Sequence, residues 1–133
     1  MHIIIGGAYN GKKSYVSQLL ADKASTWYEG QLLGEKNSNT QIAVLYAVEK
    51  LVLPMLSDRD EVELAQHVFQ QISTFQDSYD KVYIILEDMG RGIVPIEATQ
   101  RKLRDVLGRL YQLLFAHAQT VTRIWYGIPQ QLK

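Results

Sequence analysis

Apolar residues fall into two kinds of segment along the chain, short continuous runs and longer stretches with helical spacing. The continuous runs predict buried strands at residues 2–5, 42–45, 82–86 and 121–126, with residues 25–29 as a further short candidate. Strands that are apolar on both faces and separated by helices are typical of a mostly parallel sheet covered on both sides. The pattern therefore predicts a three-layer α/β fold, with residues 1–133 forming one domain.

The stretches with helical spacing predict three amphipathic helices. One follows Gly11, a second covers residues 60–75, and the longest covers residues 96–118. A shorter helix is expected after the strand at 42–45, and Pro54 limits it. The positions expected to face the core are Tyr15 or Val16, Leu19 and Leu20 in the first helix, Val62, Ala65, Val68 or Phe69, Ile72 and Phe75 in the second, and Ile96, Leu103, Leu107, Leu110 and Leu114 in the third.

A glycine-rich segment joins the first predicted strand to the first predicted helix. Its sequence, Gly6-Gly7-Ala8-Tyr9-Asn10-Gly11-Lys12, satisfies the first seven positions of the P-loop pattern. Glycines let consecutive backbone N–H groups point into one concavity, and the helix N-terminus and the lysine add positive charge for phosphates. We therefore expect residues 6–14 to bind a nucleotide. The alternative is a glycine-rich turn that binds nothing.

The eighth position of the pattern departs from expectation. It should hold Ser or Thr, whose hydroxyl binds Mg²⁺, but here it holds Lys13. Ser14 follows, yet one step along a helix rotates a side chain by about 100°, so Ser14 is not a simple replacement. Three interpretations stay open: water and substrate oxygens hold the metal, Lys13 supplies the charge instead, or the site is catalytically weakened.

A pair of carboxylates follows the most apolar predicted strand. Glu87 and Asp88 leave its carboxyl end, the edge at which open α/β sheets bind ligands. Such residues could orient a metal-bound water or accept a proton from a substrate hydroxyl. The alternative is that they are solvated residues that end the strand.

Composition narrows the classes of partner. Fourteen basic residues balance fourteen acidic ones, which argues against nucleic acid or an anionic membrane as a partner. The chain has no cysteine, and no apolar run approaches the roughly 18 residues of a membrane span. The short run before Gly6 resembles neither a signal nor a transit peptide, so we expect a cytoplasmic protein.

Taken together, the motifs resemble the adenosylcobinamide kinase/adenosylcobinamide-phosphate guanylyltransferases of cobalamin biosynthesis. That family typically opens with Gly-Gly-Ala-Arg-Ser-Gly-Lys-Ser, which is similar to residues 6–13, and later carries Asn-Glu-Val-Gly-x-Gly-Ile-Val-Pro, which is similar to residues 87–95. The resemblance covers roughly residues 1–20 and 82–133. Its remaining matches are Arg101, Leu103, Arg104, Asp105, Gly108 and Gln112 in the long helix and Gly127-Ile128-Pro129 near the end.

The resemblance implies a P-loop fold that uses ATP or GTP, with Mg²⁺ at an atypical site and a corrinoid as the second substrate. It implies catalytic roles for Lys12, for Asp88 as the match to the family's Glu, and for Glu87 beside it. It also implies that Arg101 and Arg104 contact the substrate and that the chain forms a trimer. Without the resemblance, the two arginines are equally well explained as a solvated helix face.

The middle of the chain departs from the family pattern. The family's histidine that takes up GMP has no counterpart, because residues 12–59 contain no histidine, and Tyr46 stands where the family has an acidic residue. We therefore expect phosphorylation of adenosylcobinamide without guanylyl transfer. Two alternatives are a nucleotide-binding or regulatory homologue that has lost catalysis and a kinase of another small alcohol. Tyr83, Trp125 and Tyr126 are expected to be core or sheet-edge residues.

Overall fold

The computed structural model describes residues 1–8, 10–32, 41–88 and 97–133. Tyr9, the predicted loop at 33–40, and residues 89–96 lie outside these ranges. The family-like segment is therefore described only at Glu87 and Asp88, and the predicted helix position Ile96 is not described.

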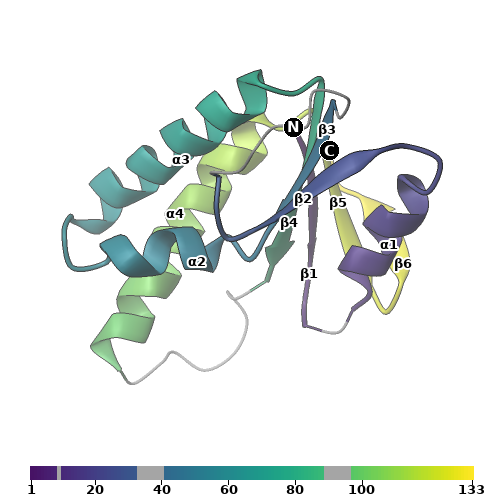
Figure 1. The fold of residues 1–133 in the computed structure, drawn as a ribbon. Coiled ribbons are helices and arrows are strands. Elements are labelled where there is room, and N and C mark those ends of the chain that lie inside the picture. Colours follow the sequence, from purple (N-terminus) through teal and green to yellow (C-terminus); the bar gives the residue numbers. More distant parts are fainter. Residues whose placement is uncertain (9, 33–40, 89–96) are drawn as a thin grey trace.

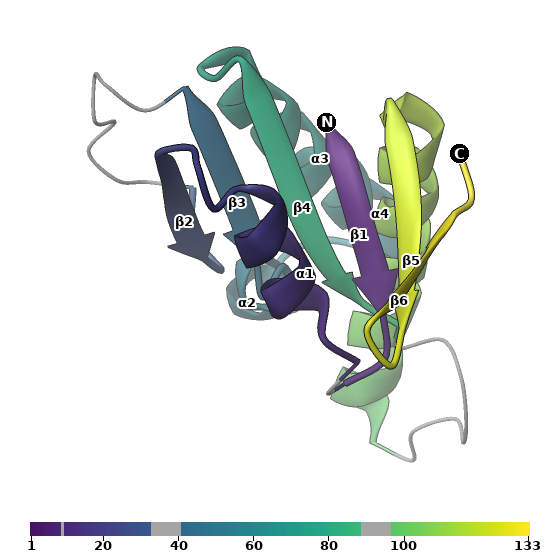
Figure 2. The same ribbon diagram turned by 90° about the vertical axis from the view of Figure 1, so that its right-hand side faces the viewer.

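The described residues form one six-stranded sheet whose spatial order is β2-β3-β4-β1-β5-β6 (Figure 2). All neighbouring pairs are parallel except β5 and β6, which pair antiparallel. The predicted strands are confirmed, including the candidate at 25–29. The strands are β1 (His2–Gly6), β2 (Ser25–Glu29), β3 (Ile42–Tyr46), β4 (Lys81–Glu87), β5 (Thr120–Trp125) and β6 (Ile128–Gln131).

Helices cover both faces of the sheet, as the sequence predicts (Figure 1). One face carries α1 (Lys12–Leu19), and the other carries α2 (Glu49–Val52), α3 (Glu61–Asp77) and α4 (Ala98–His117). Pro54 lies in a short 3₁₀ turn, Leu53–Met55, directly after α2. No helix in the described ranges has the length and apolar character needed to cross a membrane.

Each face of the sheet has its own apolar core, and side chains alternate between the two along each strand. In β4, Tyr83 and Ile85 pack toward α1, whereas Val82, Ile84 and Leu86 pack toward α3 and α4. This alternation continues past the end of the strand and decides which way the residues of the site point.

The structure corrects two positions on the predicted helix faces. Leu19 of α1 was expected to face the core but is 49% exposed, whereas Val16 and Leu20 are buried. The second correction is in α3. In α3 the buried residues are Leu64, Ala65, Val68, Ile72 and Phe75. Val62, which we expected in the stripe, is 46% exposed. At 100° per residue, Val62 lies about 110° from the centre of the buried stripe, so it faces solvent although its residue type is apolar.

The structure also adds a strand that the sequence pattern did not predict. We expected the last strand to stop at Gly127, but β5 ends at Trp125 and the chain returns as β6. Tyr126 and Gly127 have φ of 50° and 79°, the positive values that a two-residue hairpin turn requires. Because all of β6 is exposed and it contains Pro129, it lacks the apolar pattern that marks a strand.

Candidate functional site

The glycine loop, of which the structure describes residues 7, 8, 10 and 11, follows β1 at the carboxyl edge of the sheet. β1 lies between β4 and β5. Gly6 ends β1 at a point where a Cβ atom would lie 2.4 Å from the backbone oxygen of Ile124. Gly11, the N-cap residue directly before α1, has φ of 85°. Glycine is therefore required at the start of the loop by close packing and at its end by backbone conformation.

Lys12 folds back over this loop. Its Nζ donates to the carbonyl oxygens of Gly6 at 3.0 Å and Gly7 at 2.7 Å. Burial lowers the pKa of Lys12, while the negative charges of Glu87 and Asp88 act in the opposite direction. The lysine is thus held at the concave side of the loop by bonds to neutral acceptors. An anionic oxygen forms stronger bonds to an ammonium than a carbonyl does.

A cavity of about 430 Å³ opens beside the loop, within the size range of small-ligand sites. The glycine loop, the start of α1 and the ends of β3 and β4 contribute to its wall, together with the first residue of α2. Two cations and two carboxylates face it. The lining residues are Ala8, Asn10, Gly11, Lys12, Lys13, Ser14, Ala47, Glu49, Ile85 and Glu87.

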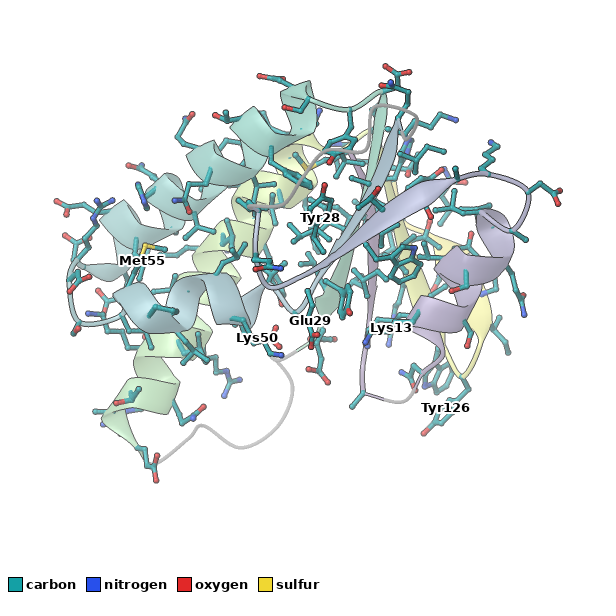
Figure 3. All side chains as sticks on the ribbon, in the orientation of Figure 1. Lys13, Tyr28, Glu29, Lys50, Met55 and Tyr126 are labelled. Atoms are coloured by element: carbon teal, nitrogen blue, oxygen red, sulfur yellow. The ribbon has the colours of Figure 1, made fainter. Side chains whose placement is uncertain are left out.

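Lys13, which lines this cavity, is in contact with Tyr46. The Nζ atom of Lys13 lies 4.1 Å from the centre of the Tyr46 ring, in cation–π geometry (the lysine is labelled in Figure 3). Tyr46 ends β3, the strand beside β4. Two of the positions at which the sequence departs from the family pattern are therefore in contact. An ammonium stands where a hydroxyl was expected, and an aromatic ring stands where an acid was expected.

These residues do not fit the usual protein site for Mg²⁺. The hydroxyl ligand is replaced by the cationic Lys13, which repels a divalent ion. The described residues contain no cluster of three or more metal-ligating side chains. Glu49 and Glu87 are the described carboxylates that line the cavity, so phosphate and water oxygens would have to supply most ligands of a bound Mg²⁺.

The two predicted catalytic carboxylates lie on opposite faces of the sheet. Glu87 continues the alternation of Tyr83 and Ile85 and lines the cavity of Lys12. Asp88 lines a second cavity of about 350 Å³ on the α4 side, while its N–H donates to the carbonyl of Gly6 at 2.9 Å. The sequence predicted the same catalytic role for both residues. In the structure, Glu87 lines the loop cavity and Asp88 lines the other cavity.

Of the two arginines that were predicted to bind the substrate, one lines the second cavity. Arg104 lines it together with Asp88, but Arg101, one turn earlier in α4, is exposed and is not among its described lining residues. Tyr111 closes this region by donating its hydroxyl hydrogen to the carbonyl of Glu87 at 2.9 Å. Burial raises the pKa of Tyr111, so its hydroxyl stays neutral and keeps donating this bond.

The chain's histidines lie away from both cavities. His2 begins β1, the opposite end from the loop, where its Nδ1 lies 2.8 Å from the hydroxyl of Thr120 and its ring stacks on Tyr83. His117 ends α4 and packs against Phe69. His67 is half-buried in α3. Burial and the nearby N-terminal ammonium and Lys81 lower the pKa of His2, which keeps it neutral.

Three residues that line the loop cavity, Ala47, Glu49 and Ile85, were not among the predicted site residues. Glu49 follows β3, so the edge rule that identified Glu87 could have identified it too. Ala47 has φ of 56°, an unfavourable value for alanine that the sequence does not reveal. Strained backbone of this kind is concentrated at functional sites.

Comparison of the sequence with models of known protein families identifies the family of this chain. The family model described as cobinamide kinase / cobinamide phosphate guanyltransferase matches residues 26–132. The chain belongs to this family. No curated protein matches the sequence. Because the matched region begins after the glycine loop, identification of that loop as a P-loop stays a prediction that depends on its own sequence and geometry.

Membership of the cobinamide kinase / cobinamide phosphate guanyltransferase family links the chain to cobalamin biosynthesis. Enzymes of this family use nucleoside triphosphates and corrinoid substrates. Which of the two activities this chain performs is not distinguished by the family, so the finer assignment has to come from the residues of the site.

Replacing Lys12 with alanine should weaken binding of ATP and GTP by roughly tenfold to a hundredfold. The reason is the net loss of one charge-assisted hydrogen bond, which contributes about 1.5–3 kcal/mol. Calorimetric titration measures the change. Lys23→Ala is the matched control, because Lys23 is exposed beyond the far end of α1. Equal affinities of the Lys12→Ala variant and the original protein would show that the loop does not bind triphosphates.

Replacing Lys13 with serine should make triphosphate binding depend more strongly on Mg²⁺. The substitution removes a cation and restores a hydroxyl ligand at the metal position. Titrations with and without Mg²⁺ should show a small difference for the original protein and a larger one for Lys13→Ser. A strong Mg²⁺ requirement in both proteins, of equal size, would contradict this interpretation of Lys13.

Proposed function

We propose that this protein is a kinase that transfers the γ-phosphoryl group of ATP or GTP to the hydroxyl of adenosylcobinamide's aminopropanol arm. The observation that carries the proposal is the convergence of Lys12, Lys13 and Glu87 on one cavity beside the glycine loop. Family membership supports the substrate, and the site supports the reaction.

In the proposed reaction, backbone N–H groups of the loop and the N-terminus of α1 hold the phosphates. Lys12 leaves the carbonyls of Gly6 and Gly7 and bonds to phosphate oxygens. Lys13 lies at the same cavity and supplies positive charge while negative charge redistributes over the transferred group. Catalysis of phosphoryl transfer depends mainly on positioning and electrostatics. The ammonium groups of Lys12 and Lys13 would therefore stabilise the transition state.

The acceptor hydroxyl is activated by Glu87 in this proposal. Its oxygen attacks the γ-phosphorus, the bond to the β–γ bridging oxygen breaks, and the hydroxyl proton passes to the Glu87 carboxylate. The products are the phosphorylated acceptor and the nucleoside diphosphate. Asp88 has a different part, because it lines the α4-side cavity with Arg104. We propose that Arg104, with exposed Arg101 one turn away, contacts the corrinoid.

Guanylyl transfer is not part of the proposal. A covalent route needs a neutral nucleophile beside the α-phosphate. His2 and His117 lie toward the opposite edge of the sheet from the loop, and His67 lies on α3. The second candidate function is binding without catalysis, which the replacement of an expected hydroxyl and an expected acid by Lys13 and Tyr46 favours.

The proposed function is tested by incubating the protein with adenosylcobinamide and ATP or GTP and measuring both possible products by mass. We expect the phosphorylated corrinoid and no GMP-capped product. Glu87→Gln should lower turnover by roughly a hundredfold or more while leaving triphosphate binding intact, because it removes the proton acceptor. Asp88→Asn is the neighbouring control and should lower turnover less.

Each outcome separates the alternatives. Triphosphate binding without a phosphorylated corrinoid would favour the binding homologue. A GMP-capped product would contradict the exclusion of guanylyl transfer. Equal turnover by Glu87→Gln and the original protein would remove Glu87 from the mechanism.

A further inference from the structure

The tip of the β5–β6 hairpin exposes two aromatic side chains. Trp125 is 61% exposed and Tyr126 is 76% exposed, so neither is a core residue. Both lie at the edge of the sheet, where β5 turns into the edge strand β6. Figure 3 shows Tyr126 projecting from the hairpin beyond the end of the sheet. Exposed apolar side chains that lie together commonly mark a binding surface.

This hairpin tip is joined to the glycine loop. The N–H of Gly127 donates to the carbonyl of Asn10 at 2.8 Å, and a Cβ atom on Gly11 would lie 3.5 Å from the Cα of Gly127. Asn10 and Gly11 also line the loop cavity. The aromatic tip is thus continuous with the proposed phosphate site rather than a separate surface.

The sheet order gives the loop two different flanks. β1 lies between β4 and β5, so Glu87 approaches from the β4 side and the aromatic tip from the β5 side. A triphosphate whose terminal phosphate points toward Glu87 leaves its ribose and base to extend toward the opposite flank, where Trp125 and Tyr126 lie.

The local backbone supports a binding role for the tyrosine. Tyr126 has φ of 50°, an uncommon conformation for a bulky residue and one more often taken by Gly or Asn in such turns. Its ring lies tilted at 49° to that of Trp125, with 5.8 Å between ring centres, so the two rings do not cover each other's faces. Both remain available to a planar ligand.

We propose that Trp125 and Tyr126 form a stacking platform for the purine base of the nucleotide, an inference that rests on the proposed binding of a triphosphate by the glycine loop. Stacking on aromatic side chains reads the surface of a base rather than its hydrogen-bonding edge. The platform therefore accepts both ATP and GTP and favours them over CTP or UTP, whose smaller rings stack less.

The test compares the affinities of GTP, ATP, CTP and inorganic triphosphate for the full chain. Tyr126→Ala and Trp125→Ala should each weaken GTP and ATP binding by roughly fivefold to a hundredfold. Both should leave the affinity for inorganic triphosphate unchanged. Tyr126→Phe is the matched control, since it keeps the ring and should keep the purine affinity.

A fluorescence readout reports stacking directly. The chain has two tryptophans, so Trp27→Phe leaves Trp125 as the only one. GTP should quench its emission, and inorganic triphosphate should not.

Three outcomes would overturn the platform. Equal losses of GTP and triphosphate affinity in the alanine variants would mean that the tip only supports the loop. Unchanged GTP affinity together with a loss of self-association would make the tip a contact between copies of the chain. An original protein that binds triphosphate but shows no purine preference would contradict the platform alone, whereas one that binds neither ligand would also contradict the proposed function.

Discussion

The carboxyl edge of the sheet depends on the packing of one residue, Gly6, between β4 and β5. Its missing side chain lets the backbone lie against Ile124 of β5, where a Cβ would be 2.4 Å from the carbonyl oxygen. Its own carbonyl accepts hydrogen bonds from Lys12 and from the backbone of Asp88. The start of the glycine loop, its lysine and the end of β4 are therefore fixed by a single backbone position.

Around Gly6, the residues of the site lie on two faces of the sheet and on two flanking strands, β4 and β5. Alternation along β4 directs Glu87 to the loop cavity and Asp88 to the α4-side cavity. The hydrogen bond from Gly127 to Asn10 ties the last hairpin to the other flank of the loop. Cationic, acidic and aromatic groups thus meet around one short loop, although they come from distant parts of the chain.

Much of this arrangement could be predicted because it follows from local pattern. Continuous apolar runs identified the parallel strands, and the glycines with Lys12 identified the loop between β1 and α1. The contact of Lys13 with Tyr46 could not be predicted, because the two residues lie far apart in the sequence, in α1 and β3, and meet only in the folded chain. The strand β6 was missed because it is exposed throughout, so burial leaves no periodic signal in it. For Trp125 and Tyr126 the sequence left core and sheet-edge positions open, and the exposure of both residues beside the edge strand β6 excludes the core.

The central claim is that the glycine loop binds a nucleoside triphosphate between Glu87 and the aromatic hairpin. The most direct test is a ¹H–¹⁵N spectrum of the labelled protein during titration with a non-hydrolysable GTP analogue. We predict that the amide signals of Gly11, Lys12 and Gly127 shift together, while those of His2 and Thr120 at the opposite edge stay in place. Shifts concentrated at His2 and Thr120, or no shifts at saturating analogue, would contradict the account.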